Sequence, residues 1–228
     1  MPVDSTHESA HPTPTSILPD GRDGERSAAR QEIIAGSVLV LMTALGGIYF
    51  FFRPEPAAFD HWVRVSSTSG SWFTTVTTLR YPLVVILGSV FFAAVMVARN
   101  RVRALACLIA PPLALIASEL VIKPLVGRTI GGVLSYPSGS TVGAAALATA
   151  AVLVSPRRWR PITAVVATLF ALWMALAVVA LRWHLPSDAL AGLAFGVGVV
   201  LLVDGFVWEV HRNLINTWLR HRRPRAVR

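Results

Sequence analysis

The stretch Tyr136-Pro137-Ser138-Gly139-Ser140 precedes a long apolar segment and brings small polar residues to the point where a helix is expected to begin. The first backbone N–H groups of a helix have no partner inside it, and they bind anions well with help from the helix dipole. A more ordinary function of Ser138 or Ser140 would be to cap that helix. The stretch therefore predicts either a helix cap or one wall of an anion site.

Long apolar segments dominate the 228-residue chain, which is 54% hydrophobic and 14% charged, with a mean hydropathy of +0.59. A helix needs about 20 residues to cross a hydrocarbon core of roughly 30 Å, and its backbone must be satisfied internally. Six segments approach this length: 33–52, 82–98, 104–122, 140–155, 161–181 and 187–207. We therefore predict an all-α fold, a six-span transmembrane helical bundle. Its domain organisation would be a disordered cytoplasmic tail (1–32), a six-helix membrane domain (33–210) and a basic cytoplasmic tail (211–228).

Positive charge is distributed unevenly between the two sides of this predicted bundle. Fifteen of the 21 Lys and Arg residues fall in the two tails and in the loops after the second and fourth segments. The positive-inside rule then places both termini in the cytoplasm. The net charge of +9 is explained by attraction to anionic membrane lipids, so no nucleic-acid partner is expected.

Ionisable residues gather at the opposite, external ends of the segments. His184 and Asp188 are one helical turn apart, so the carboxylate could accept a hydrogen bond from one ring nitrogen and leave the other free to attack. Alternatively, they are interfacial residues at a helix N-terminus, where an aspartate is favourable in any case. Lys123 lies four residues after Glu119, so it could form an ion pair within the helix or reach an anion.

The longest external loop, residues 53–81, is rich in aromatic residues with polar residues between them. This pattern is typical of an amphipathic element on the outer membrane surface, and it is equally compatible with simple interfacial anchoring. The sequence leaves open whether the loop covers a site.

Three motifs in this order resemble those of the membrane branch of the type 2 phosphatidic acid phosphatase/vanadium haloperoxidase superfamily. That family has Lys-x6-Arg-Pro, then Pro-Ser-Gly-His, then Ser-Arg-x5-His-x3-Asp, on a six-span helical core. Lys123, the Pro-Ser-Gly at 137–139, His184 and Asp188 match these motifs. The other motif positions differ: Ile130-Gly131 stand in place of Arg-Pro, Ser140 in place of histidine, and Ala177-Val178 in place of Ser-Arg.

The resemblance implies an integral-membrane phosphatase of the cell membrane, acting on a lipid phosphate or polyprenyl diphosphate at the outer face through a phosphohistidine. It implies no metal or other cofactor. His184 would be the nucleophile and Asp188 would orient it. The phosphate would be bound by residues of the matching motifs and by nearby cations: Lys123, Arg128, Ser138, Gly139, Ser140 and Arg182.

Ser140 leaves two interpretations open, because the family's histidine at this position protonates the leaving group and serine cannot do so near neutral pH. The chain would act best on a leaving group that needs little protonation, such as the phosphate of a diphosphate. Alternatively, it would bind or move a phospholipid without hydrolysing it. A third possibility, an unrelated transporter or assembly subunit, would place Lys123, Ser138 and His184 far apart.

Overall fold

The computed structural model describes residues 21–62, 75, 77 and 81–222, and this part of the chain is almost entirely helical. A π-helix over Ser118–Ile122 joins α5 to α6, and two short strands pair in an antiparallel ladder before α7. The elements are α1 (Gly21–Phe52), α2 (Ala58–Trp62), α4 (Pro82–Val97), α5 (Arg101–Ala117), α6 (Lys123–Val126), β1 (Thr129–Ile130), β2 (Val133–Leu134), α7 (Gly139–Val154), α8 (Arg160–Ala180) and α9 (Pro186–Arg222).

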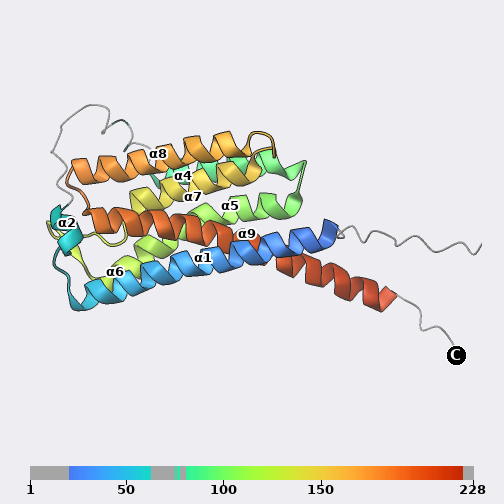
Figure 1. Ribbon diagram of the computed structural model, residues 1–228, viewed down its shortest axis with the longest axis horizontal. Coiled ribbons are helices and arrows are strands. Elements are labelled where there is room, and N and C mark those ends of the chain that lie inside the picture. Colours follow the sequence, from blue (N-terminus) through green and yellow to red (C-terminus); the bar gives the residue numbers. More distant parts are fainter. Residues whose placement is uncertain (1–20, 63–74, 76, 78–80, 223–228) are drawn as a thin grey trace, which may run out of the picture.

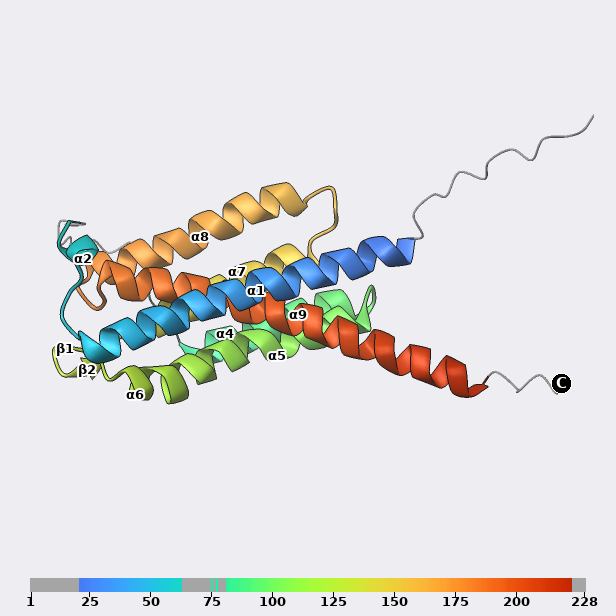
Figure 2. The same ribbon diagram turned by 60° about the horizontal axis from the view of Figure 1, so that its bottom comes forward.

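The long helices lie side by side as an elongated bundle (Figures 1 and 2). The helix α9 contacts α1, α5, α7 and α8, and α7 also contacts α4 and α5. Small residues such as Ala110, Ala114 and Ala146 fill the buried core between α5, α7 and α9. The short elements α2, α6, β1 and β2 gather at one end of the bundle, whereas α1 begins and α9 ends toward the other (Figure 2).

Within the described residues, four helical stretches are long and apolar enough to cross a membrane: Arg26–Phe52, Arg101–Val126, Arg160–Ala180 and Pro186–Leu214. The remaining apolar helices, Pro82–Val97 and Gly139–Val154, are shorter. Many large apolar side chains face outward from the bundle, as expected where lipid replaces water as the solvent. The all-helical prediction is thus confirmed, while the count of six spans and the orientation of the termini stay predictions.

The two terminal helices extend beyond the predicted tail boundaries. α1 begins at Gly21, so residues 21–32, which we assigned to a disordered tail, are helical. Their Ala, Arg, Gln and Glu residues are good helix formers, and Glu32 pairs with Arg103 of α5 at 3.2 Å. At the other end, α9 continues past residue 210 to Arg222. Of the loop that we predicted to be external (53–81), α2 is helical, while most of the predicted amphipathic element lies outside the described residues.

Close packing of α9 on α7 brings the beginnings of these two helices together. A Cβ atom added to Gly192 would overlap Thr141 Oγ1 and the Ser138 carbonyl oxygen, and one added to Gly196 would overlap the Val142 carbonyl oxygen. The Gly192-x-x-x-Gly196 spacing therefore allows the two backbones to approach each other. In consequence, the loop that carries His184 lies beside the Pro-Ser-Gly stretch.

Candidate active site

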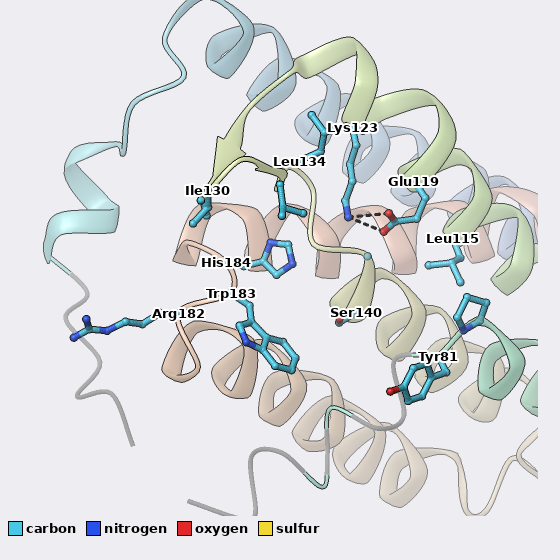
Figure 3. A pocket seen from close by; sticks show the side chains of 14 residues that line it. Tyr81, Leu115, Glu119, Lys123, Ile130, Leu134, Ser140, Arg182, Trp183 and His184 are labelled. Atoms are coloured by element: carbon cyan, nitrogen blue, oxygen red, sulfur yellow. Dashed lines mark hydrogen bonds and ion pairs between the residues drawn. The ribbon is translucent and has the colours of Figure 1, made fainter. Parts of the chain in front are cut away.

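A cavity of about 800 Å³ opens at the end of the bundle where α6, β1 and β2 lie. Its walls come from the π-helix and α6, from the first turn of α7, from the loop between α8 and α9, and from the start of α4 (Figure 3). The residues that line it are Tyr81, Pro82, Leu115, Glu119, Lys123, Ile130, Gly131, Val133, Leu134, Gly139, Ser140, Arg182, Trp183 and His184.

Lys123 and Glu119 form an ion pair on one wall of this cavity. The Lys123 ammonium lies 2.8 Å from Oε1 and 2.9 Å from Oε2 of Glu119, as the i,i+4 spacing predicted. The Glu119 carboxylate also lies against the first turn of α7, because a Cβ atom added to Gly139 would overlap its Oε1. Glu119 belongs to the π-helix, a rare conformation that often occurs at functional sites.

The first turn of α7 contributes Gly139 and Ser140 to the cavity, and Ser138 lies behind them. Ser138 is fully buried, and its backbone N–H donates to the Asp188 carbonyl at 3.0 Å. Its side chain makes no capping hydrogen bond, so the predicted serine cap is not formed there. The first N–H groups of α7 therefore remain available to an anion. Ser138 itself is a link between α7 and α9 and does not line the cavity.

His184 and Arg182 come from the short loop between α8 and α9. His184 lines the cavity, and its Nδ1 lies 3.8 Å from Asp188 Oδ2. This distance is too long for a hydrogen bond, and Nδ1 is buried without a hydrogen-bond partner among the described residues. The expected His184–Asp188 hydrogen bond is therefore not formed. Arg182 is exposed on the rim, and its side chain extends away from His184 (Figure 3).

Asp188 turns instead toward Arg128, and both side chains are completely buried behind the cavity. Arg128 Nη1 donates to Asp188 Oδ1 at 2.6 Å and to Ser187 Oγ at 2.8 Å. Its Nη2 donates to Asp60 Oδ2 at 3.1 Å, and the guanidinium lies 3.8 Å from the centroid of the Phe50 ring. Arg128 does not line the cavity. The prediction that it binds phosphate thus has no support in the geometry, because its donors are already used within the fold.

Asp60 of α2 is a partner of Arg128 that the sequence did not suggest. It accepts hydrogen bonds from the Ser187 N–H and hydroxyl, both at 2.8 Å, and from the Ala57 N–H at 3.0 Å. Burial alone would raise the pKa of this carboxyl, but these hydrogen bonds and the one from Arg128 hold the pKa below its usual value. One signal was available in the sequence: Asp60 is an acidic residue in a loop (53–81) that also carries Arg53, Arg64 and Arg80.

The structure therefore divides the predicted site residues into two groups. Lys123, Gly139, Ser140, Arg182 and His184 line one cavity. Ser138, Asp188 and Arg128 are buried and support its walls through the α7–α9 and α2–α9 contacts. Lys123 and His184 line the same cavity, and so does Gly139, the neighbour of Ser138. This proximity counts against the third possibility, an unrelated transporter or assembly subunit.

The comparison with protein families gives one match: the model described as the PAP2 superfamily matches residues 31–212. The matched range includes every described helix that contributes to the cavity. No curated protein and no solved structure matches the chain.

Proposed function

Because the chain belongs to the PAP2 superfamily, we propose that it is a membrane phosphatase that hydrolyses a lipid phosphate or a polyprenyl diphosphate in this cavity. The observation that supports the proposal most is the convergence of Lys123, the first turn of α7 and His184 on one cavity, from three separate parts of the chain. A nucleophile, a cation and free N–H groups are what phosphoryl transfer requires from a protein.

In the proposed reaction, the substrate phosphate binds between the Lys123 ammonium and the N–H groups of Gly139 and Ser140. The free ring nitrogen of His184 attacks phosphorus, and the resulting phosphohistidine is hydrolysed by water. No metal takes part. Asp188 would accept a hydrogen bond from Nδ1 of His184 after a small movement of the ring, since catalytic hydrogen bonds often shorten only in the complex with substrate.

The apolar outer surface of the bundle supports a lipid substrate, because such a substrate would reach the cavity from the bilayer. The distribution of arginine would place the cavity on the extracytoplasmic face of the cell membrane. Among lipid phosphates, those with a good leaving group suit a cavity that has serine at position 140.

The direct test is phosphate release by the purified full-length protein from phosphatidic acid and from a polyprenyl diphosphate. We expect release from at least one of these lipids and its loss to background in His184→Ala. His211→Ala is the matched control, because His211 lies in the distal part of α9, outside the cavity. If His184→Ala released phosphate as fast as the parent, His184 would not be the nucleophile.

A second candidate function is binding or moving a phospholipid without hydrolysis. It is favoured by the 3.8 Å separation of His184 and Asp188 and by the use of Asp188 as a partner of Arg128. For this function, the parent would bind vesicles or nanodiscs containing phosphatidic acid without releasing phosphate, and Lys123→Met would weaken the binding. An inactive parent together with an active Ser140→His variant would also favour this second function. Strong activity in the parent would eliminate it.

A further inference from the structure

We propose that Glu119 donates the proton to the leaving group, the function that histidine at position 140 serves in the family motif. This inference rests on the proposed phosphatase function. It concerns a residue that no family motif includes, and it gives the Glu119–Lys123 pair a function beyond stabilising the helix.

The location of Glu119 is the first argument. Among the described residues that line the cavity, Glu119 is the only one with a carboxyl group. Its Oε1 lies against Gly139, the residue directly before Ser140. The carboxylate is therefore next to the position from which the missing histidine would act. Its side chain is 39% exposed, compared with 11% for Lys123, so it remains accessible to a substrate in the cavity.

The second argument is the position of Glu119 relative to His184, the proposed nucleophile. His184 enters the cavity from the α8–α9 loop, whereas Glu119 and Lys123 enter it from the π-helix and α6 on the facing side (Figure 3). In phosphoryl transfer the attacking and leaving atoms lie roughly in line on opposite sides of phosphorus. A nucleophile on the His184 wall therefore directs the leaving oxygen toward the wall that carries Glu119.

The ion pair explains how Glu119 would obtain the proton. Without substrate, the two carboxylate oxygens of Glu119 contact the Lys123 ammonium. When a phosphate monoester monoanion binds Lys123, Glu119 loses the ammonium as its partner and has a second anion beside it. Two anions in contact favour protonation of either the carboxylate or the phosphate. Transfer of the proton of the substrate P–OH to Glu119 leaves a dianionic phosphate on Lys123 and a neutral carboxylic acid facing the ester oxygen.

The reaction then balances without any other reactant. The His184 nitrogen forms a bond to phosphorus, the bond from phosphorus to the ester oxygen breaks, and that oxygen takes the Glu119 proton and leaves as an alcohol. Water next attacks phosphorus and gives one proton to the Glu119 carboxylate as the N–P bond breaks. Release of that proton with the phosphate product returns Glu119 to Lys123.

The test compares two leaving groups in the parent and in Glu119→Gln. Phosphatidic acid releases an alkoxide, which needs a proton, whereas p-nitrophenyl phosphate releases a stabilised phenolate, which does not. Loss of a general acid typically lowers the rate by about 10²–10⁴-fold. We expect a loss of this size in kcat on phosphatidic acid and a much smaller one on p-nitrophenyl phosphate. Adding Ser140→His to Glu119→Gln is expected to restore much of the activity on phosphatidic acid.

Glu209→Gln is the matched control, because Glu209 also pairs with a cation one turn away, Arg212, but does not line the cavity. Thermal unfolding in detergent shows whether Glu119→Gln folds like the parent. An equal loss on both substrates, or parent-like turnover of phosphatidic acid, would overturn the inference and leave Glu119 as the counter-ion of Lys123. A parent that hydrolyses a polyprenyl diphosphate but neither of these two substrates would overturn this inference alone. A parent that releases phosphate from none of the three would remove the proposed phosphatase function as well.

Discussion

Arg128 and Asp188 form a completely buried ion pair, with 2.6 Å between Nη1 of the guanidinium and Oδ1 of the carboxylate. The pair joins the loop after α6 to the first turn of α9, and a second ion pair, from Arg128 to Asp60, connects α2 to them. It lies behind the cavity that His184 lines. We therefore expect Arg128 to act on the candidate active site by fixing the beginning of α9, and not by contacting phosphate directly.

Arg128→Met is expected to lower the stability of the protein severely. Removing one partner of a buried ion pair leaves the other charge uncompensated, which costs about 3–5 kcal/mol, and here Asp60 and Asp188 would both lose the guanidinium. Thermal unfolding in detergent measures the loss, with Arg53→Met as the control, since Arg53 is exposed. A parent-like melting temperature combined with weaker binding of phosphate would show instead that Arg128 contacts the substrate.

Asp60 predicts how stability depends on pH. The folded pKa of this carboxyl lies below its ordinary value of 3.8. The stabilisation is therefore fully present above the ordinary pKa and is lost as the pH falls through the lower pKa of the folded state. Asp60→Asn should destabilise the protein at neutral pH, and the difference from the parent should shrink in acid. Unfolding of the two proteins across the acid range measures this, and a difference that grows toward low pH would contradict the assignment.

The contact between α7 and α9 predicts a stability effect of two glycines. Gly192→Ala and Gly196→Ala each place a methyl group where α7 already lies, and overpacking of this kind typically costs about 1–3 kcal/mol. Activity should fall as well, because separating the two helices moves His184 away from Ser140. Gly24→Ala is the control, since a Cβ atom there meets nothing within 4 Å. Tolerance of both changes, measured as unchanged melting temperatures, would mean that the contact is looser than the structure indicates.

Much of the architecture could be predicted from the sequence because apolar segments and their polar ends are local properties. The helices lie where long apolar runs occur, and the Glu119–Lys123 pair follows from the i,i+4 spacing on one helix. The gathering of Lys123, Gly139, Ser140 and His184 around one cavity follows from their shared position at the ends of such segments.

The partners of Arg128 could not be predicted in the same way. Arg128 and Asp60 are 68 residues apart in sequence, and no periodicity relates α2 to the loop after α6. An arginine near an anion-binding motif is naturally predicted to bind the anion. Only the tertiary structure reveals that buried carboxylates already accept hydrogen bonds from the Arg128 guanidinium. The same contact explains why Asp188 turns away from His184, although their spacing in sequence suits a hydrogen bond.

Two substitutions of Arg182 separate its effect on protein stability from its effect on substrate binding. The helix α8 ends in a Schellman motif: the Arg182 N–H donates to the Val179 carbonyl and the Trp183 N–H to the Val178 carbonyl, both at 3.0 Å. Arg182 has a φ of 59°, in the left-handed region where glycine is favoured and other residues cost roughly 1 kcal/mol. Arg182→Gly should therefore raise the free energy of unfolding by about that amount, and Arg182→Ala should not.

Both changes should weaken substrate binding modestly, within about fivefold, because contacts of an exposed charge are typically worth 1 kcal/mol or less. Thermal unfolding and KM for phosphatidic acid, measured on both variants, test these expectations. An unchanged KM would exclude Arg182 from the phosphate-binding residues, whereas a lower melting temperature for Arg182→Gly would contradict the conformation assigned to this turn.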